Sequence, residues 1–293
     1  MNLSVLYRGA LETCNYDCSY CPFAKRPETP EKRQQDTESL EKFLGWVRRE
    51  TDVQFSIFFT PWGEALPIQR YQKAIAELSH FPHVEKVVMQ TNLSARLDFL
   101  QECQKGKLAF WCTYHPSQVK REKFLQQCHA LKSWGVRFSV GVVGKPSHFQ
   151  EIQDLRRDLP EEVYLWVNAY QKGSQMYPYT PEQTQLLGSI DPLFELNTRK
   201  YASRGKSCFA GETVVTVDEH GDIRRCHFVD QVLGNIHAPD WRNALQSRAC
   251  SRRFCDCHIG YVHLKELELY PVFEGGILER IPAEKGSGLL RSP

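Results

Sequence analysis

Short apolar segments alternate with segments of helical periodicity along the chain as far as Val167. The expected strands span residues 3–7, 55–59, 87–90, 108–113, 137–143 and 163–167. Helical spacing of apolar residues follows Asp36, which we expect to cap the first helix, and recurs over 68–78, 97–100, 124–131 and 149–155. Strands that alternate with helices pair in parallel through right-handed crossovers. The sequence therefore predicts an α/β fold built on a parallel sheet.

Three cysteines follow the first expected strand. Cys14, Cys18 and Cys21 lie in the segment CNYDCSYC. Thiolates are the usual ligands of iron–sulfur clusters, and three thiolates so closely spaced can hold three irons of a four-iron cluster. The fourth iron is then left without a protein ligand, which separates a site for chemistry from one that only holds structure or passes electrons. A strand-end loop is also where barrel enzymes place their chemistry.

Structural zinc and disulfide bonds agree less well with the positions of these cysteines. A structural zinc site usually shows paired cysteines or cysteine with histidine, whereas the next cysteine here is Cys103. No signal segment and no membrane-spanning apolar run are expected, so a reducing, cytoplasmic environment is favoured over one that forms disulfides. Eleven cysteines in such a chain favour metal binding, although Cys103, Cys112 and Cys128 fall on helix or strand positions and are expected to be packed thiols.

The three-cysteine segment resembles that of the radical S-adenosylmethionine (radical SAM) enzymes. The resemblance implies a [4Fe-4S] cluster whose open iron is chelated by the amino and carboxylate groups of S-adenosylmethionine. It implies reductive cleavage of this cofactor to methionine and a 5′-deoxyadenosyl radical, followed by hydrogen abstraction from a substrate. It also implies a partial (β/α)6 TIM-like barrel, with which the six expected strands agree, and an external electron donor of the flavodoxin or ferredoxin type.

The segment TPWGEAL after the second expected strand resembles the glycine-glycine-glutamate-proline segment that meets the cofactor's ammonium group in this family. Trp62 stands in place of the first glycine and Ala65 in place of the proline. Gly63 would let the backbone approach closely, and Glu64 offers a carboxylate for a charge-assisted hydrogen bond. A simple loop turn is the alternative interpretation.

Further cofactor contacts are expected from residues at strand ends and in the cysteine loop. Asn92, in the segment QTN, resembles the threonine-asparagine strand end of the family, and Thr113 ends the fourth strand, where a ribose or carboxylate contact is common. Tyr20 stands where the family carries an aromatic residue near the adenine. His115 is a weaker candidate, because a lone histidine is more often a satisfied structural residue than a catalyst.

A second cysteine group lies near the carboxyl end. Cys208 is followed by twelve residues, Gly221, four more residues and Cys226, and the apolar residues around the segment DEHGD predict a β-hairpin. This spacing resembles the SPASM and Twitch extensions that carry auxiliary iron–sulfur clusters. The five cysteines after residue 200 suffice for one four-iron cluster. The expected ligands are Cys208, Cys226, Cys255 and Cys257, with Cys250 able to replace one of the last pair, and zinc on the same thiolates is the main alternative.

These observations predict a radical SAM barrel over 1–200, a small cysteine-rich Twitch-like domain containing the hairpin over 201–270, and a loose tail over 271–293. The formal charge of +2 gives no reason to expect nucleic acid, and no membrane association is expected. The basic residues near the last cysteines are interpreted as a solvated face or as counter-charge for thiolates.

The expected substrate is a peptide, a protein or a natural-product precursor. Because the first strand begins at residue 3, no amino-terminal peptide-recognition domain is expected, so a carrier-bound or small-molecule substrate stays open. Conversion of an RNA base, with zinc in the carboxy-terminal domain, is a further alternative. A non-enzymatic electron carrier would use four cysteines for each cluster, and the three-cysteine loop argues against it.

Overall fold

The computed structural model describes residues 1–21, 23, 26–173 and 175–283. Its main feature is a nine-stranded sheet in the order β12-β11-β10-β1-β2-β3-β4-β5-β6. Six neighbouring strands are parallel, namely β1 (Asn2–Tyr7), β2 (Gln54–Phe59), β3 (Val84–Thr91), β4 (Leu108–Thr113), β5 (Arg137–Val143) and β6 (Leu165–Asn168). Each expected strand overlaps one of these, so the prediction of an α/β fold with a parallel sheet is confirmed.

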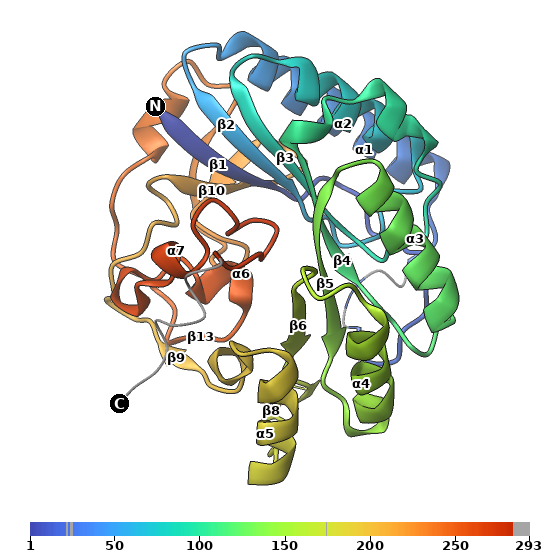
Figure 1. The fold of residues 1–293 in the computed structure, drawn as a ribbon. Helices are drawn as coiled ribbons and strands as arrows, with labels where there is room; N and C mark the ends of the chain where they lie inside the picture. The colour runs from blue at the N-terminus through green and yellow to red at the C-terminus, as the bar shows by residue number, and fades with distance from the viewer. Residues whose placement is uncertain (22, 24–25, 174, 284–293) are drawn as a thin grey trace.

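Helices cover one face of this sheet (Figure 1). They are α1 (Pro30–Arg49), α2 (Gln69–His80), α3 (Arg121–Ser133) and α4 (Phe149–Asp158), with the 3₁₀ turns η1 (Asp98–Glu102), η2 (Lys105–Lys107) and η3 (Pro146–His148) between strands. The helix expected over 97–100 is therefore a 3₁₀ turn. Alternate strand residues such as Val5 and Ile57 pack under the helices, whereas Leu6 and Phe58 face the other side. No described helix is both long and apolar enough to span a bilayer.

The first helix begins earlier than predicted. Thr29, not Asp36, is its N-cap, and the Thr29 hydroxyl accepts a hydrogen bond from the backbone N–H of Lys32 at 3.3 Å, with Pro30 in the first turn. Asp36 lies within the helix and is almost fully buried, where its carboxylate accepts from Arg70 Nε at 2.6 Å and from Tyr71 Oη at 2.8 Å. An aspartate that holds a neighbouring helix looks the same in sequence as one that caps its own.

The predicted hairpin is confirmed, and it extends the main sheet. β10 (Val214–Val217) pairs antiparallel with β11 (Asp222–Arg224), which pairs with β12 (Val232–Asn235). Gly221 in the turn has φ +79°, a conformation that favours glycine. β10 also pairs in parallel with β1. The carboxy-terminal segment is thereby joined to the edge of the sheet beside the cysteine loop.

The remaining elements are short and lie mostly after the sixth parallel strand. They are β7 (Gln171–Lys172), β8 (Gln175–Met176), α5 (Pro181–Ile190), η4 (Phe194–Asn197), β9 (Tyr201–Ala202), η5 (Trp241–Ala244), β13 (Phe254–Cys255), α6 (His258–Tyr261), η6 (Lys265–Leu267) and α7 (Leu269–Val272). β9 pairs with β13, and β7 with β8, both antiparallel. Helices α6 and α7 lie across the sheet from α1–α4 (Figure 1).

The last described residues pack against the sheet face opposite the helices. Leu278 is buried in one apolar cluster with Phe58, Trp111 and Trp166. Glu279 is fully buried, and Lys86 Nζ binds its Oε1 at 2.7 Å. The prediction of a loose tail is therefore wrong for residues 271–283, part of which is buried against the sheet face. Residues 284–293 lie outside the described part of the chain.

Candidate active site

The carboxyl ends of β1–β6 surround a cavity of about 310 Å³. The predicted cluster ligands Cys14, Cys18 and Cys21 line this cavity. All the residues predicted to contact the cofactor line it too, namely Tyr20, Gly63, Glu64, Asn92 and Thr113. Residues from four strand-end loops thus meet in one place, as expected when parallel strands end at the same edge of a sheet.

The environment of the cysteine loop suits anionic sulfur. The Tyr16 backbone N–H donates to Cys14 Sγ at 3.4 Å, and Asn92 Nδ2 lies 3.9 Å from the same sulfur. Burial raises the pKa of the Cys14 thiol and so works against the free thiolate, which binding to a cation would restore. Hydrogen bonds to ligand sulfurs are a common means of tuning iron–sulfur clusters. The loop therefore fits a cluster held by three thiolates.

No three His, Cys, Asp or Glu side chains within the described ranges converge as they would around one metal ion. Each thiolate of a cubane binds a different iron, so cluster ligands are spaced more widely than the ligands of a single ion. The spacing of the loop cysteines is thus unlike that of a preformed single-ion site.

Gly63 brings two loops into contact. A Cβ atom at this position would lie 1.9 Å from the backbone oxygen of Thr13, immediately before the cysteine loop. The backbone N–H of Glu64 donates to the same oxygen at 2.9 Å. The sequence predicted that this glycine allows close approach to a cofactor, and the structure shows a close approach to the loop that carries Cys14.

Glu64 links the loop after β2 to the end of β3. Its Oε1 accepts from Thr91 Oγ1 at 2.7 Å and from the Leu66 backbone N–H at 3.1 Å, and its Oε2 accepts from the Asn92 backbone N–H. Burial raises the pKa of Glu64 to about 7 despite these bonds. Because Oε2 accepts only one of these bonds, it retains acceptor capacity toward the cavity.

Two of the other predicted contacts, Asn92 and Tyr20, are held by hydrogen bonds within the protein. Asn92 Nδ2 donates to Asn15 Oδ1 at 2.9 Å and so fixes the strand end to the cysteine loop. Tyr20 Oη lies 2.8 Å from Nδ1 of His115, which also lines the cavity. Burial lowers the pKa of His115 to about 4, so its ring is neutral at pH 7.

Sequence reasoning missed two strand-end residues. Arg8, directly after β1, is almost fully buried, donates from Nε to His227 Nδ1 at 3.2 Å and lies 3.8 Å from the ring centre of Trp62. Asn168, at the end of β6, lines the same cavity. Asn92 and Thr113 were predicted because they are polar residues at strand ends. Arg8 and Asn168 are too, so the same pattern could have identified them.

The five carboxy-terminal cysteines lie near one another, and one of them, Cys257, also lines the cavity. Burial raises the pKa of Cys226 to about 11, and the neighbouring thiols of Cys208 and Cys250 act in the same direction. Burial also raises the pKa of the Cys255 thiol. The neighbouring thiol of Cys257 adds to this rise, followed by those of Cys226, Cys208 and Cys250. Cys257, however, lines the cavity. It precedes α6 as the N-cap residue.

The three other cysteines, Cys103, Cys112 and Cys128, are buried in the main core, as expected.

A second cavity, of about 600 Å³, adjoins the first. Tyr20, Cys21, Asn168 and Cys257 line both. The second cavity continues past β6 to residues 170–173 and to the segment 256–259 of the carboxy-terminal part. The two cavities therefore form adjoining halves of one space, with the cysteine loop on its wall.

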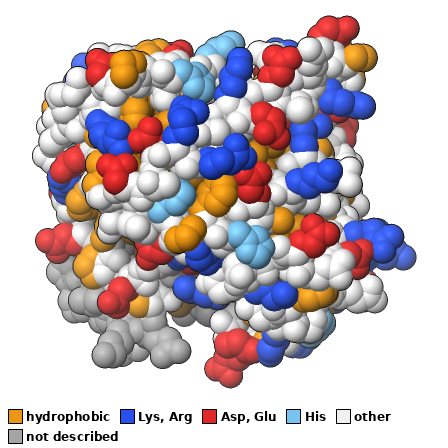
Figure 2. Space-filling view, turned by 90° about the horizontal axis from the view of Figure 1, so that it is seen from above, with side chains coloured by type: hydrophobic (Ala, Val, Ile, Leu, Met, Phe, Trp, Pro, Cys, Tyr) orange, Lys and Arg blue, Asp and Glu red, His pale blue; other side chains and the backbone are white. Residues whose placement is uncertain are grey.

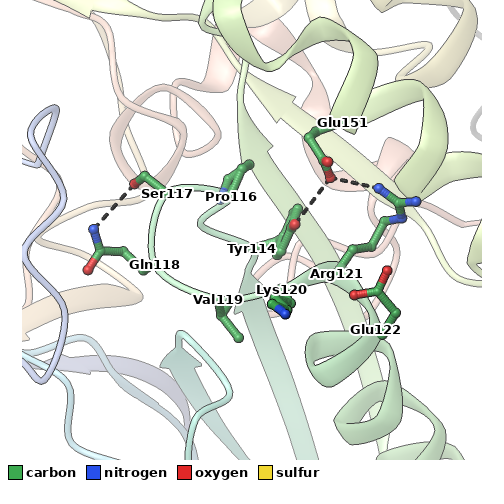
Figure 3. A pocket seen from close by; sticks show the side chains of 9 residues that line it. All are labelled: Tyr114, Pro116, Ser117, Gln118, Val119, Lys120, Arg121, Glu122 and Glu151. Carbon is green, nitrogen blue, oxygen red and sulfur yellow. Dashed lines mark hydrogen bonds and ion pairs between the residues drawn. The ribbon is translucent and has the colours of Figure 1, made fainter.

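A third cavity, of about 390 Å³, lies beside the loop that follows β4 (Figure 3). Arg121 Nη1 binds Glu151 Oε2 at 2.8 Å, and Tyr114 donates to the same oxygen. Gln118 accepts from the Asp17 backbone N–H at 3.0 Å and so supports the cysteine loop from outside. No predicted cluster or cofactor residue lines this cavity. We interpret it as part of the structural frame of the site.

Charge is mixed on the face seen in Figure 2. Lys and Arg side chains are interspersed there with Asp and Glu, and no large basic area covers this face (Figure 2). A basic stripe of the kind that binds nucleic acid is therefore not seen on it.

No protein-family model and no curated protein matches the chain. Among solved structures, it is similar to polyhistidine-tagged anSMEcpe with bound AdoMet (S-adenosylmethionine), with a TM-score of 0.57 and 15% identity over 84% of this chain and 78% of that one. It is also similar to native anSMEcpe with bound AdoMet and the Cp18Cys peptide, with a TM-score of 0.55 and 15% identity over 84% and 80%. These similarities show a shared α/β fold. That fold agrees with the radical SAM family that the cysteine segment resembles.

Proposed function

We propose that this chain is a radical SAM enzyme. The observation that carries the proposal is that Cys14, Cys18 and Cys21 line one cavity together with Gly63, Glu64 and Asn92, at the strand ends of a fold shared with an AdoMet-binding protein. The sheet and helices would form the partial (β/α)6 barrel of that family, extended at the β1 edge by β10, β11 and β12.

The three cysteines would hold a [4Fe-4S] cluster with one open iron. When bound, this cluster supplies the electron that splits S-adenosylmethionine into methionine and a 5′-deoxyadenosyl radical, which takes a hydrogen atom from the substrate. Glu64 Oε2 would accept from the cofactor's ammonium group. Tyr20 would cover the adenine, and Thr113 would contact the ribose or carboxylate. Asn92 would orient both the cysteine loop and Glu64.

We propose that Cys208, Cys226, Cys250 and Cys255 hold a second cluster within a Twitch-like segment over 201–270. We choose Cys250 over Cys257 as the fourth ligand because Cys257 lines the cavity. Both thiols lie near Cys255, so proximity to that cysteine does not separate them. The second cluster would accept the electron that hydrogen abstraction leaves on the substrate, or help to anchor the substrate. Zinc on the same thiolates is the alternative occupant.

The proposed substrate is a peptide, a protein or a natural-product precursor, and the proposed electron donor is a flavodoxin or ferredoxin in the cytoplasm. A peptide substrate is supported by the similarity to anSMEcpe, whose structure contains the bound Cp18Cys peptide. A small molecule is the second candidate, favoured by the extent of the second cavity, about 600 Å³. Conversion of an RNA base finds no support on the face of mixed charge in Figure 2.

The test is the iron and sulfide content of anaerobically reconstituted protein, with electron paramagnetic resonance, beside a variant lacking Cys14, Cys18 and Cys21. About eight irons falling to about four would establish two four-iron clusters. About four falling to none, with zinc in both proteins, would support zinc in the second site. An unchanged iron content in the variant would refute the proposal.

A further inference from the structure

The second cavity, which Glu64 does not line, contains a set of polar groups that the cofactor would not use. Its wall there is built from β4, β6 and the segment 256–259, and it includes Trp111, Asn168 and His258. We propose that this cavity binds the substrate through an anionic oxygen group, a carboxylate or a phosphate. The inference rests on the proposed function, since it places the substrate beside the cofactor half of the same space.

Asn168 is oriented by a buried arginine. Arg280 is 1% exposed, and its Nη1 donates to Asn168 Oδ1 at 2.7 Å. Because a guanidinium group only donates, the oxygen of the amide must face Arg280. The Nδ2 group of Asn168 then points away from Arg280 and offers its N–H groups as donors. Asn168 thus offers a fixed N–H donor to both cavities.

Two further side chains offer donors to the same space. Gln90 Oε1 accepts from Thr60 Oγ1 at 2.7 Å, which leaves the Gln90 amide nitrogen as a donor on the wall shared by both cavities. Trp111 is 3% exposed and lines the second cavity, and its indole N–H has no partner among the residues that the structure describes. A buried donor without a partner is costly unless a ligand supplies an acceptor.

The charges around this end favour an anion. Arg280 lies behind the wall and donates to two amide oxygens, on Asn168 and Asn197. The buried carboxyl of Asp191 is also near it: burial raises the pKa of Asp191, and the Arg280 charge acts against that shift. Lys172 lines the cavity as a second cation. The carboxylate on this wall, Asp256, lies 3.8 Å from Lys200. With Asp191 and Asp256 set against Arg280, Lys172 and Lys200, one net positive charge remains around this end of the cavity. A concave site with a net positive charge concentrates anions.

The wall also includes an acceptor. Tyr261 Oη donates to Asn197 Oδ1 at 2.7 Å and lies 3.4 Å from His258 Nδ1, so the histidine donates from that nitrogen. Nε2 of His258 is then an acceptor, and it has no partner among the described residues. A hydroxyl or N–H group beside the anionic group of the substrate would satisfy it.

The experiment is isothermal titration calorimetry on anaerobically reconstituted full-length protein with S-adenosylmethionine, in phosphate-free buffer. The probes are phenyl phosphate, phenylacetate and the isosteric phenylacetamide, together with N-acetylglycylphenylalanine and its carboxy-terminal amide. We expect the anionic probes to bind at least tenfold more tightly than the matched amides. The relative affinities of the small acid and the peptide acid distinguish a free metabolite from a peptide as the source of the group.

Asn168→Asp is the informative variant, because an aspartate can still accept from Arg280 while it replaces the N–H donor with negative charge. We expect it to weaken binding of the anionic probes at least tenfold. Asn243→Asp, an exposed change of the same chemistry, should leave binding unchanged. Equal affinity for acids and amides, or wild-type affinity in Asn168→Asp, would overturn the inference. Anion binding without 5′-deoxyadenosine formation would instead overturn only the proposed function.

Discussion

Gly63→Ala tests the contact between the cysteine loop and the loop after β2. Optimal contacts between non-bonded carbon atoms are about 3.5 Å or longer, whereas the new Cβ would lie 1.9 Å from Thr13 O and 2.7 Å from Thr13 C. These are backbone atoms, so a rotamer change cannot relieve the overlap. The loop that leads to Cys14 must move.

The magnitude follows from two effects. Overpacking of a tight site costs about 1–3 kcal/mol, and loss of the Glu64 N–H bond to Thr13 O adds about 0.5–1.5 kcal/mol. We expect the free energy of unfolding of the apo-protein to fall by about 1.5–4.5 kcal/mol in total. We also expect less iron at the first cluster after reconstitution, because displacement of Thr13 shifts the adjacent Cys14.

The assay is urea unfolding followed by circular dichroism under anaerobic reducing conditions, with iron analysis of the reconstituted protein. Gly188→Ala is the control, since this glycine lies within α5 and a Cβ there meets nothing within 4 Å. The control should gain up to about 1 kcal/mol from helix propensity. If Gly63→Ala kept normal stability and iron content and only bound S-adenosylmethionine more weakly, the glycine would serve the cofactor and our reasoning would be refuted.

Two other variants test the packing of the carboxy-terminal part. Leu278→Ala removes a side chain that is 7% exposed and packs against the sheet. Urea unfolding should therefore show a loss of about 2–5 kcal/mol in the free energy of unfolding. The control Val232→Ala, at a residue that is 45% exposed, should change it by about 0.5 kcal/mol or less, and equal effects of the two variants would contradict this packing. Cys250→Ala should lose about four irons, the content of one cluster, while Cys257→Ala keeps the wild-type iron content; the reverse result would show that Cys257 is the ligand.

The sequence predicted most of the residues that line the candidate cavity, because they lie in local motifs. The three cysteines share one loop, and the polar residues stand at strand ends. Alternating strands and helices give a parallel sheet, whose strand ends meet at one edge, so these residues come together. The position of Cys257 could not be predicted in this way. It is two residues from Cys255, but β13 ends at Cys255 and α6 begins at His258, so the chain turns between the two thiols. Spacing alone does not reveal that turn.

The association of distant segments was also beyond the sequence. β10 is a buried apolar run, and its pairing with β1 depends on an edge that no local pattern identifies. The segment Ile277–Arg280 is buried because it packs on the sheet face that carries Trp111 and Trp166. No local pattern in the sequence indicates that this face is uncovered by helices. Arg8 and Asn168 were missed although both stand at strand ends, where polar residues were already expected.

The most direct test of the central claim is the formation of 5′-deoxyadenosine from S-adenosylmethionine under strong reduction, with wild-type protein and Cys18→Ala side by side. We expect 5′-deoxyadenosine and methionine from the wild type in equal amounts, and neither from Cys18→Ala. Because Cys18 lies outside the second cysteine group, the variant should retain its second cluster. Formation of 5′-deoxyadenosine by Cys18→Ala at the wild-type rate would contradict the account.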